Sequence, residues 1–106
     1  MIMLCKFSGK EDYEDKINNL LSEFDLLRCA DINVQRCSVD ENRRLKLALS
    51  LFGESKVILL DEPTFSMSMT TKRRMWELIR KHKSNKCILI ATQDMTEAEE
   101  LGDRIA

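Results

Sequence analysis

The sequence predicts an α/β fold in which a small parallel sheet is flanked by helices. Two uninterrupted apolar runs, KVILL at 56–60 and CILIAT at 87–92, have the length and composition of fully buried parallel strands. A segment with helical periodicity lies between them, which is the order of a parallel crossover connection. Only three glycines and one proline interrupt the 106 residues, so we expect long elements and short loops.

Two helices are expected before the first strand. Residues 11–28 place apolar side chains at helical spacing behind an acidic first turn. A second helix is expected from about Val39 to Phe52, with Gly53 ending it. The positions expected to face inward are Tyr13, Ile17, Leu20 or Leu21, Phe24 and Leu27 in the first helix, and Leu45, Ala48, Leu49 and Phe52 in the second.

Two more helices are expected after the strands. Residues 70–83 form one, with Met75, Leu78 and Ile79 inward and Trp76 at an edge. The other opens at 96–104, where Thr96 and Glu99 have capping-box spacing. Residues 105–106 would start a third strand. Because so few strands make a thin sheet, the chain is interpreted as an incomplete domain, with a helical part at 1–53 and an α/β part at 54–106.

Charge and hydropathy exclude several classes of protein. The 17 basic and 18 acidic residues give a net charge of −1, whereas a nucleic-acid-binding domain would have a basic excess. We therefore expect no nucleic-acid partner. No apolar run approaches the ~18 residues of a membrane span, and the first residues lack the basic region of a signal peptide.

The four cysteines are predicted to be free. Cys5, Cys29, Cys37 and Cys87 form no C-x-x-C pair, and the single histidine, His82, cannot complete a zinc site with them. Two disulfides are the alternative. The long aliphatic segments instead favour mostly buried thiols in a cytosolic domain.

An acidic pair, Asp61 and Glu62, directly follows the first strand. Ligands of open parallel sheets bind beyond the carboxyl ends of the strands. An aspartate there can help to hold Mg²⁺, and a neighbouring glutamate can polarise an attacking water. The alternative is that the two carboxylates only cap the next helix.

The wider sequence resembles the second half of an ABC-transporter nucleotide-binding domain of the A subfamily. The segments that resemble it are CSVDENRRLKLALSLFGESKVILLDEPT, RRMWELIR and ILIATQDMTEAEELGDRIA, and the similarity runs from about Lys16 to Ala106. The resemblance implies a partial P-loop-NTPase-type parallel sheet together with a helical subdomain that holds the signature loop.

The resemblance also implies roles for individual residues. Asp61 matches the Walker B aspartate that associates with Mg²⁺, and Glu62 matches the catalytic glutamate. Gln93 aligns with the switch histidine, and its amide can still donate to a γ-phosphate oxygen but cannot shuttle a proton. Ser38 is the retained serine of the signature loop. Its alternative role is a capping box with Glu41, in S-x-x-E spacing, at the start of the second helix.

Three departures from the family pattern weaken the expected activity. Val39 and Asp40 replace the signature glycines that permit close approach to phosphate. Ser68 replaces the D-loop aspartate. No G-x-x-x-x-G-K-[ST] loop is present, and residues 8–11, SGKE, are interpreted as a turn.

The sequence therefore predicts part of a domain that, in its full context, binds ATP and Mg²⁺ and couples hydrolysis to transmembrane transport of lipid. The chain alone is expected to hydrolyse ATP poorly or not at all. Its expected partners are a second nucleotide-binding domain and the transmembrane domain of a transporter, at the cytoplasmic face of a membrane, or in the cytosol if the chain is free. The alternative is a catalytically inactive module that pairs with an intact ATP-binding domain.

Overall fold

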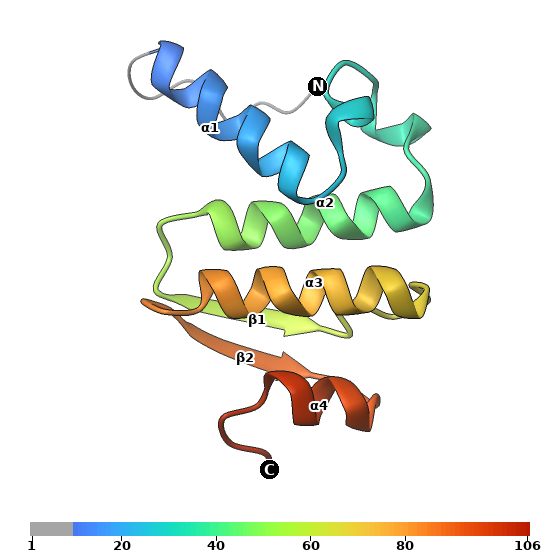
Figure 1. Ribbon diagram of the computed structural model, residues 1–106, viewed down its shortest axis with the longest axis vertical. Coiled ribbons are helices and arrows are strands. Elements are labelled where there is room, and N and C mark those ends of the chain that lie inside the picture. Colours follow the sequence, from blue (N-terminus) through green and yellow to red (C-terminus); the bar gives the residue numbers. More distant parts are fainter. Residues whose placement is uncertain (1–9) are drawn as a thin grey trace. The chain divides into compact units, whose positions relative to one another are not determined.

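The computed structural model describes residues 10–106, with side chains from residue 14 onwards. The side chain of Tyr13 lies outside the described part, as do residues 8–9 of the turn expected at 8–11. Lys10 and Glu11 belong to a helix, so the turn does not extend over them. The chain divides into two units, Met1–Ala48 and Leu49–Ala106. Its elements are α1 (Lys10–Glu23), two short 3₁₀ turns η1 (Leu27–Cys29) and η2 (Val34–Arg36), α2 (Val39–Phe52), β1 (Val57–Asp61), α3 (Met69–His82), β2 (Cys87–Ala91) and α4 (Met95–Leu101) (Figure 1).

In the first unit, α1 ends earlier than the sequence predicts. Asp25 adopts a left-handed conformation, with φ 55°. The Asp25 amide donates to Ser22 O and the Leu26 amide donates to Leu21 O, which is the pattern that closes a helix at a left-handed residue. The turn rotates the following side chains, so that Leu26 is buried and Leu27 is 54% exposed. The predicted inward position of Leu27 is therefore wrong.

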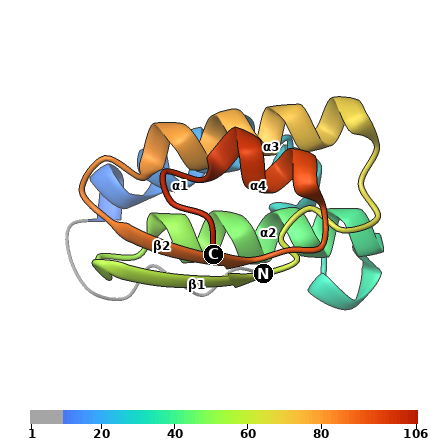
Figure 2. The same ribbon diagram turned by 90° about the horizontal axis from the view of Figure 1, so that it is seen from below.

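In the second unit, β1 and β2 form a parallel pair in the register Val57 to Cys87 through Asp61 to Ala91. Helices α3 and α4 lie on the same side of this pair (Figure 2). Met75, Leu78 and Ile79 are buried on α3, as predicted. The α/β class with a parallel sheet and flanking helices is thus confirmed.

Within the described residues the sheet is covered on one face only, which corrects the expectation of fully buried strands. Ile58 and Leu60 are buried, but Val57 is 59% exposed and Leu59 72% exposed. Leu89, the neighbour of Leu59 on β2, is 66% exposed. Residues 105–106 form no strand, so the described part of the chain contains two strands and not three.

The start of α4 differs from the predicted capping box of Thr96 and Glu99. The N-cap is Asp94, whose Oδ1 accepts from the amides of Thr96 at 3.0 Å and Glu97 at 3.3 Å. An aspartate is a strong N-cap, and here it begins the helix at Met95. None of the described helices has the length and apolarity needed to cross a membrane.

Candidate functional site

Glu62 lies where the carboxyl ends of β1 and β2 meet. Its amide donates to Ala91 O at 2.8 Å, which extends the ladder by one bond, and its backbone then turns into the left-handed region at φ 46°. The Glu62 side chain is held from the other strand: Oε1 accepts from the Gln93 amide at 2.8 Å, and Oε2 lies 3.5 Å from Thr92 Oγ1. The two strand ends therefore position this carboxyl group jointly.

Glu62 and Gln93 line one cavity of about 260 Å³. Lys72 of α3 enters the same cavity, where its Nζ binds Asp94 Oδ2 at 2.6 Å. The Lys72 ammonium holds the pKa of the Asp94 carboxyl below its usual range. The structure thus brings together the two residues that the sequence assigns to catalysis. The complete lining is Glu62, Thr64, Phe65, Lys72, Gln93, Asp94 and Glu97.

One of the residues that line this cavity is a buried carboxyl group that the sequence analysis missed. Glu97 is 1% exposed, and its Oε1 accepts from Thr64 Oγ1 at 2.5 Å and from Trp76 Nε1 at 3.1 Å. Trp76 is itself 2% exposed, so α3 buries it together with the three residues predicted to face inward. One signal of this buried carboxyl group was present in the sequence: Glu97 lies three positions after Asp94, on the inward side of a short helix.

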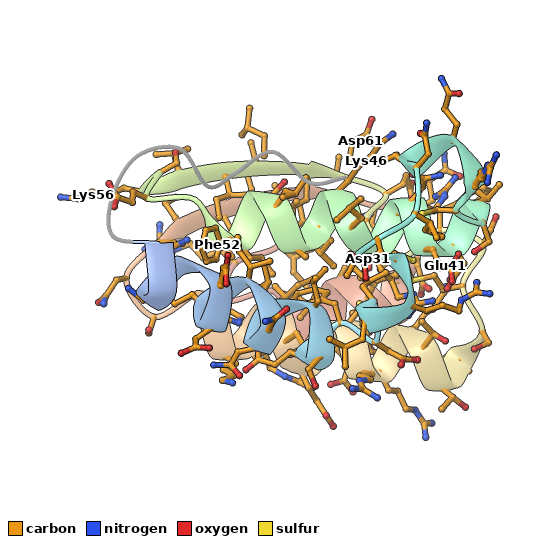
Figure 3. The ribbon with its side chains drawn as sticks, turned by 90° about the horizontal axis from the view of Figure 1, so that it is seen from above. Asp31, Glu41, Lys46, Phe52, Lys56 and Asp61 are labelled. Carbon is orange, nitrogen blue, oxygen red and sulfur yellow. The ribbon has the colours of Figure 1, made fainter. Side chains whose placement is uncertain are left out.

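Asp61 points elsewhere. It is the last residue of β1 and is exposed (Figure 3). The alternation of exposed and buried residues along β1 puts it on the same sheet face as Leu59. It does not line the cavity, and no described residue forms a hydrogen bond or ion pair with its carboxylate. Side chains alternate between the two faces of a strand. The carboxylate of Asp61 is on the exposed face and therefore does not join Gln93 and Asp94, which line the cavity.

Ser38 belongs to the first unit, where it forms the predicted capping box. The Glu41 amide donates to Ser38 Oγ at 3.1 Å, and the Ser38 amide donates to Glu41 Oε2 at 2.8 Å. Arg28 binds Glu41 Oε1 through Nε at 3.1 Å and also through Nη2. The hydrogen bond from Arg28, together with that from the Ser38 amide, lowers the pKa of Glu41 to about 2.

Three residues depart from the family pattern in the signature loop and the D-loop. Two of them have partners in the structure and one is exposed to solvent. Val39 is 71% exposed. Asp40 forms an ion pair with Arg44, with a distance of 2.8 Å between Oδ2 and Nε. Ser68 is the N-cap of α3, where its Oγ accepts from the Thr71 amide at 3.3 Å. Asp40 and Ser68 thus both stabilise helix starts.

The donor set fits Mg²⁺ better than it fits a triphosphate. An open carboxylate such as Asp61 can take part in a Mg²⁺ site that keeps most of its waters. The cavity, by contrast, is lined by three carboxyl groups and one ammonium, and that ammonium is already paired with Asp94. A triphosphate would need cations and backbone amides from outside the described residues.

Comparison with known proteins identifies a consistent set of relatives. No family profile matches the chain. It is 40% identical over 92 residues, 87% of its length, to an ABC transporter A family member 7 of Dictyostelium discoideum. It is 34% identical over 98 residues, 92% of its length, to a glucosylceramide transporter of Mus musculus. It is 32% identical over 108 residues, 100% of its length, to a retinal-specific phospholipid-transporting ATPase of Homo sapiens. The chain spans 11%, 4% and 5% of these relatives.

Proposed function

Because the chain belongs to the A subfamily of ABC transporters, we propose that it forms the Walker B and switch-loop part of an ATP-binding domain. In the whole protein this domain binds ATP with Mg²⁺ and couples hydrolysis to movement of a lipid through a membrane. Two relatives are named as transporters of glucosylceramide and of phospholipid, which supports a lipid as the substrate class.

The observation that supports this function best is the fixed carboxyl group of Glu62. Hydrolysis requires a base within hydrogen-bond distance of the attacking water. Glu62 Oε1 is held 2.8 Å from the Gln93 amide, at the wall of the cavity, and the Gln93 side chain is exposed beside it. In this proposal Glu62 orients and deprotonates the water, and Gln93 donates its side-chain amide to the γ-phosphate.

The remaining proposed roles belong to Asp61 and Ser38. Asp61 holds the hydration shell of Mg²⁺, which when bound neutralises charge on the transferring phosphate. Ser38 Oγ accepts one bond from the Glu41 amide and keeps its own proton for a phosphate oxygen supplied by a second nucleotide-binding domain. The phosphate-binding loop comes from residues outside this chain. The transporter's transmembrane domain is the other proposed partner, at the cytoplasmic face of the membrane.

A titration with Mg²⁺ and then ATP tests the proposal on the chain as it is. The fluorescence of Trp76 is a suitable reporter of ATP binding, because its indole binds Glu97, which lines the cavity together with Glu62.

The metal is followed separately by NMR. We expect Mn²⁺, used as a paramagnetic substitute for Mg²⁺, to broaden NMR signals around residues 60–63 in the wild type and not in Asp61→Asn. Glu54→Gln, which alters another exposed acid of the same unit, is the matched control and should leave the broadening unchanged.

ATP should add little to this binding, because the phosphate loop is supplied elsewhere. Binding to the folded state alone would stabilise it by about 2.7 kcal/mol at 100 times the dissociation constant. A thermal shift of that size with ATP would overturn the proposal that the loop must come from outside. Mn²⁺ broadening that persists in Asp61→Asn would overturn the role of Asp61.

A second candidate is a catalytically inactive module that pairs with an intact ATP-binding domain. It is favoured by the capping box, which gives Ser38 a structural role, and by the exposed valine that replaces a signature glycine beside it. Restoring both glycines, as Val39→Gly with Asp40→Gly in the whole protein, separates the two candidates. Increased ATP turnover supports a weakened catalytic site, whereas unchanged turnover supports the inactive module.

A further inference from the structure

Three potential metal ligands converge in the first unit, and none of them is a residue to which the proposed function gives a role in catalysis. The sulfur atoms of Cys29 and Cys37 and a carboxylate oxygen of Glu41 all lie within 4.8 Å of one another. The three residues come from different elements: Cys29 ends η1, Cys37 follows η2, and Glu41 lies in the first turn of α2. Figure 3 labels Glu41 at this end of α2. Their meeting is therefore a product of the fold and not of a local sequence motif.

Both cysteines are free thiols. Cys29 is 3% exposed and Glu41 6% exposed, whereas Cys37 is partly exposed. The cluster thus has two shielded ligands and one side that an ion can approach from solvent. From this convergence we infer that Cys29, Cys37 and Glu41 bind a thiophilic divalent cation of the zinc type, with water as the fourth ligand.

The ligand chemistry selects this class of ion. Thiolates prefer soft or borderline metals, and zinc accepts a mixture of sulfur and carboxylate ligands in tetrahedral sites, with one position open to water. Mg²⁺ and Ca²⁺ prefer oxygen ligands and would use the sulfurs poorly. Each thiol releases its proton to solvent as its sulfur binds the ion, so binding changes no oxidation state.

The charges around the cluster also suit a divalent cation. Two thiolates and one carboxylate exceed the charge of the ion by one negative unit, and Arg28 supplies one positive charge through its ion pair with Glu41. Glu41 Oε1 accepts from both Nε and Nη2 of Arg28, whereas Oε2 accepts from the Ser38 amide and has a second lone pair for the ion. Arg28 and Ser38 therefore orient the carboxylate as outer partners of the metal site.

Binding of Co²⁺, an optical substitute for Zn²⁺, tests the inference. We use a Cys5→Ser, Cys87→Ser background, which retains only the two cysteines of the cluster. One equivalent of Co²⁺ should give the intense visible bands of a tetrahedral site together with sulfur-to-metal charge transfer, and Zn²⁺ should displace it. Loss of an outer-shell partner already costs about 10–100-fold in metal affinity, so Cys37→Ser should weaken binding by at least about tenfold.

A protection experiment on the wild-type chain avoids any question of misfolded variants. With Zn²⁺ present, alkylation followed by mass spectrometry should show Cys37 protected and the exposed Cys87 fully modified. Equal modification of Cys37 and Cys87 overturns the inference. So do weak octahedral Co²⁺ bands without charge transfer, full affinity in Cys37→Ser, or a Cys29–Cys37 disulfide that forms in air while the reduced chain binds no Zn²⁺.

Discussion

Glu97 is a buried acidic side chain, and it remains in the core because its carboxyl oxygen is paired. Oε1 accepts from both Trp76 and Thr64. A buried acceptor without donors costs several times the net value of the bond it would have made. These two donors therefore fix the position of α4 relative to α3. They also fix the part of the cavity lining that Glu97 shares with Glu62.

We expect Trp76→Phe to lower the free energy of unfolding by about 2 kcal/mol, because it removes one donor from a buried carboxyl group. Urea denaturation measures the change. Phe65→Leu is the control: Phe65 is 57% exposed, and its replacement should cost less than about 0.5 kcal/mol. Equal losses in the two variants would show that the indole bond to Glu97 contributes nothing specific.

At the scale of elements, periodicity predicted the helices and strands, and local hydrogen bonds determined where they end. Apolar spacing placed α2 at the observed residues because its pattern is uninterrupted up to Gly53. The end of α1 was missed, since Asp25 can be helical or left-handed and the sequence around it favours neither. The position of Glu62 at the carboxyl end of a strand followed from the strand pattern.

Two features of the sites could not be predicted from the sequence: the hydrogen bond from the Gln93 amide to Glu62, and the cluster of Cys29 and Cys37. Both depend on contacts between segments that are distant in the sequence.

The end of α1 can be stabilised by substitution. Asp25 has a left-handed backbone, at φ 55°, which glycine adopts without the steric cost of a side chain. Relief of a left-handed penalty of about 1–2 kcal/mol outweighs the greater unfolded-state entropy of glycine, about 0.4–1 kcal/mol. We therefore expect Asp25→Gly to raise the free energy of unfolding by about 0.5–1 kcal/mol. Asp25→Ala, measured in the same thermal denaturation series, should lower it. A stabilising alanine would contradict the left-handed turn.

The start of α4 should show a dependence on pH. Lys72 lowers the pKa of Asp94 below its ordinary value of 3.8. The ionised Asp94 therefore stabilises the folded state fully above pH 3.8, and this contribution is lost as the pH falls from there through the lowered pKa. Asp94→Asn keeps an N-cap acceptor but removes the charge.

We expect the wild type to melt at a higher temperature than Asp94→Asn at neutral pH, and the difference to shrink as the pH falls below 3.8. Asp103→Asn is the matched control, since Asp103 binds Lys83 with its side chain 86% exposed. Its effect on the melting temperature should be small throughout. A wild-type advantage that is constant with pH would contradict the role of the Lys72–Asp94 pair.

At the scale of the whole molecule, the feature that matters most for contacts between copies is the exposed face of the sheet. Val57, Leu59 and Leu89 lie on this face, each more than half exposed. A two-stranded sheet also leaves both outer edges of its strands unpaired within the described residues. Open edges and contiguous apolar surface both promote association between copies. We therefore expect copies of the free chain to associate through this face.

Polar substitution of this face should suppress the association without unfolding the chain. We expect Leu59→Thr with Leu89→Thr to shift the chain towards monomer in sedimentation velocity, because the substitutions remove apolar surface and threonine retains a high strand propensity. The melting temperature should change little, since both leucines are largely exposed in the folded chain. The matched pair Ile58→Thr with Ile90→Thr alters the covered face and should instead destabilise the fold by several kcal/mol, at about 1–3 kcal/mol per residue. A chain that is monomeric without the substitutions, or an association that the outward pair leaves unchanged, would contradict the role of the open sheet face.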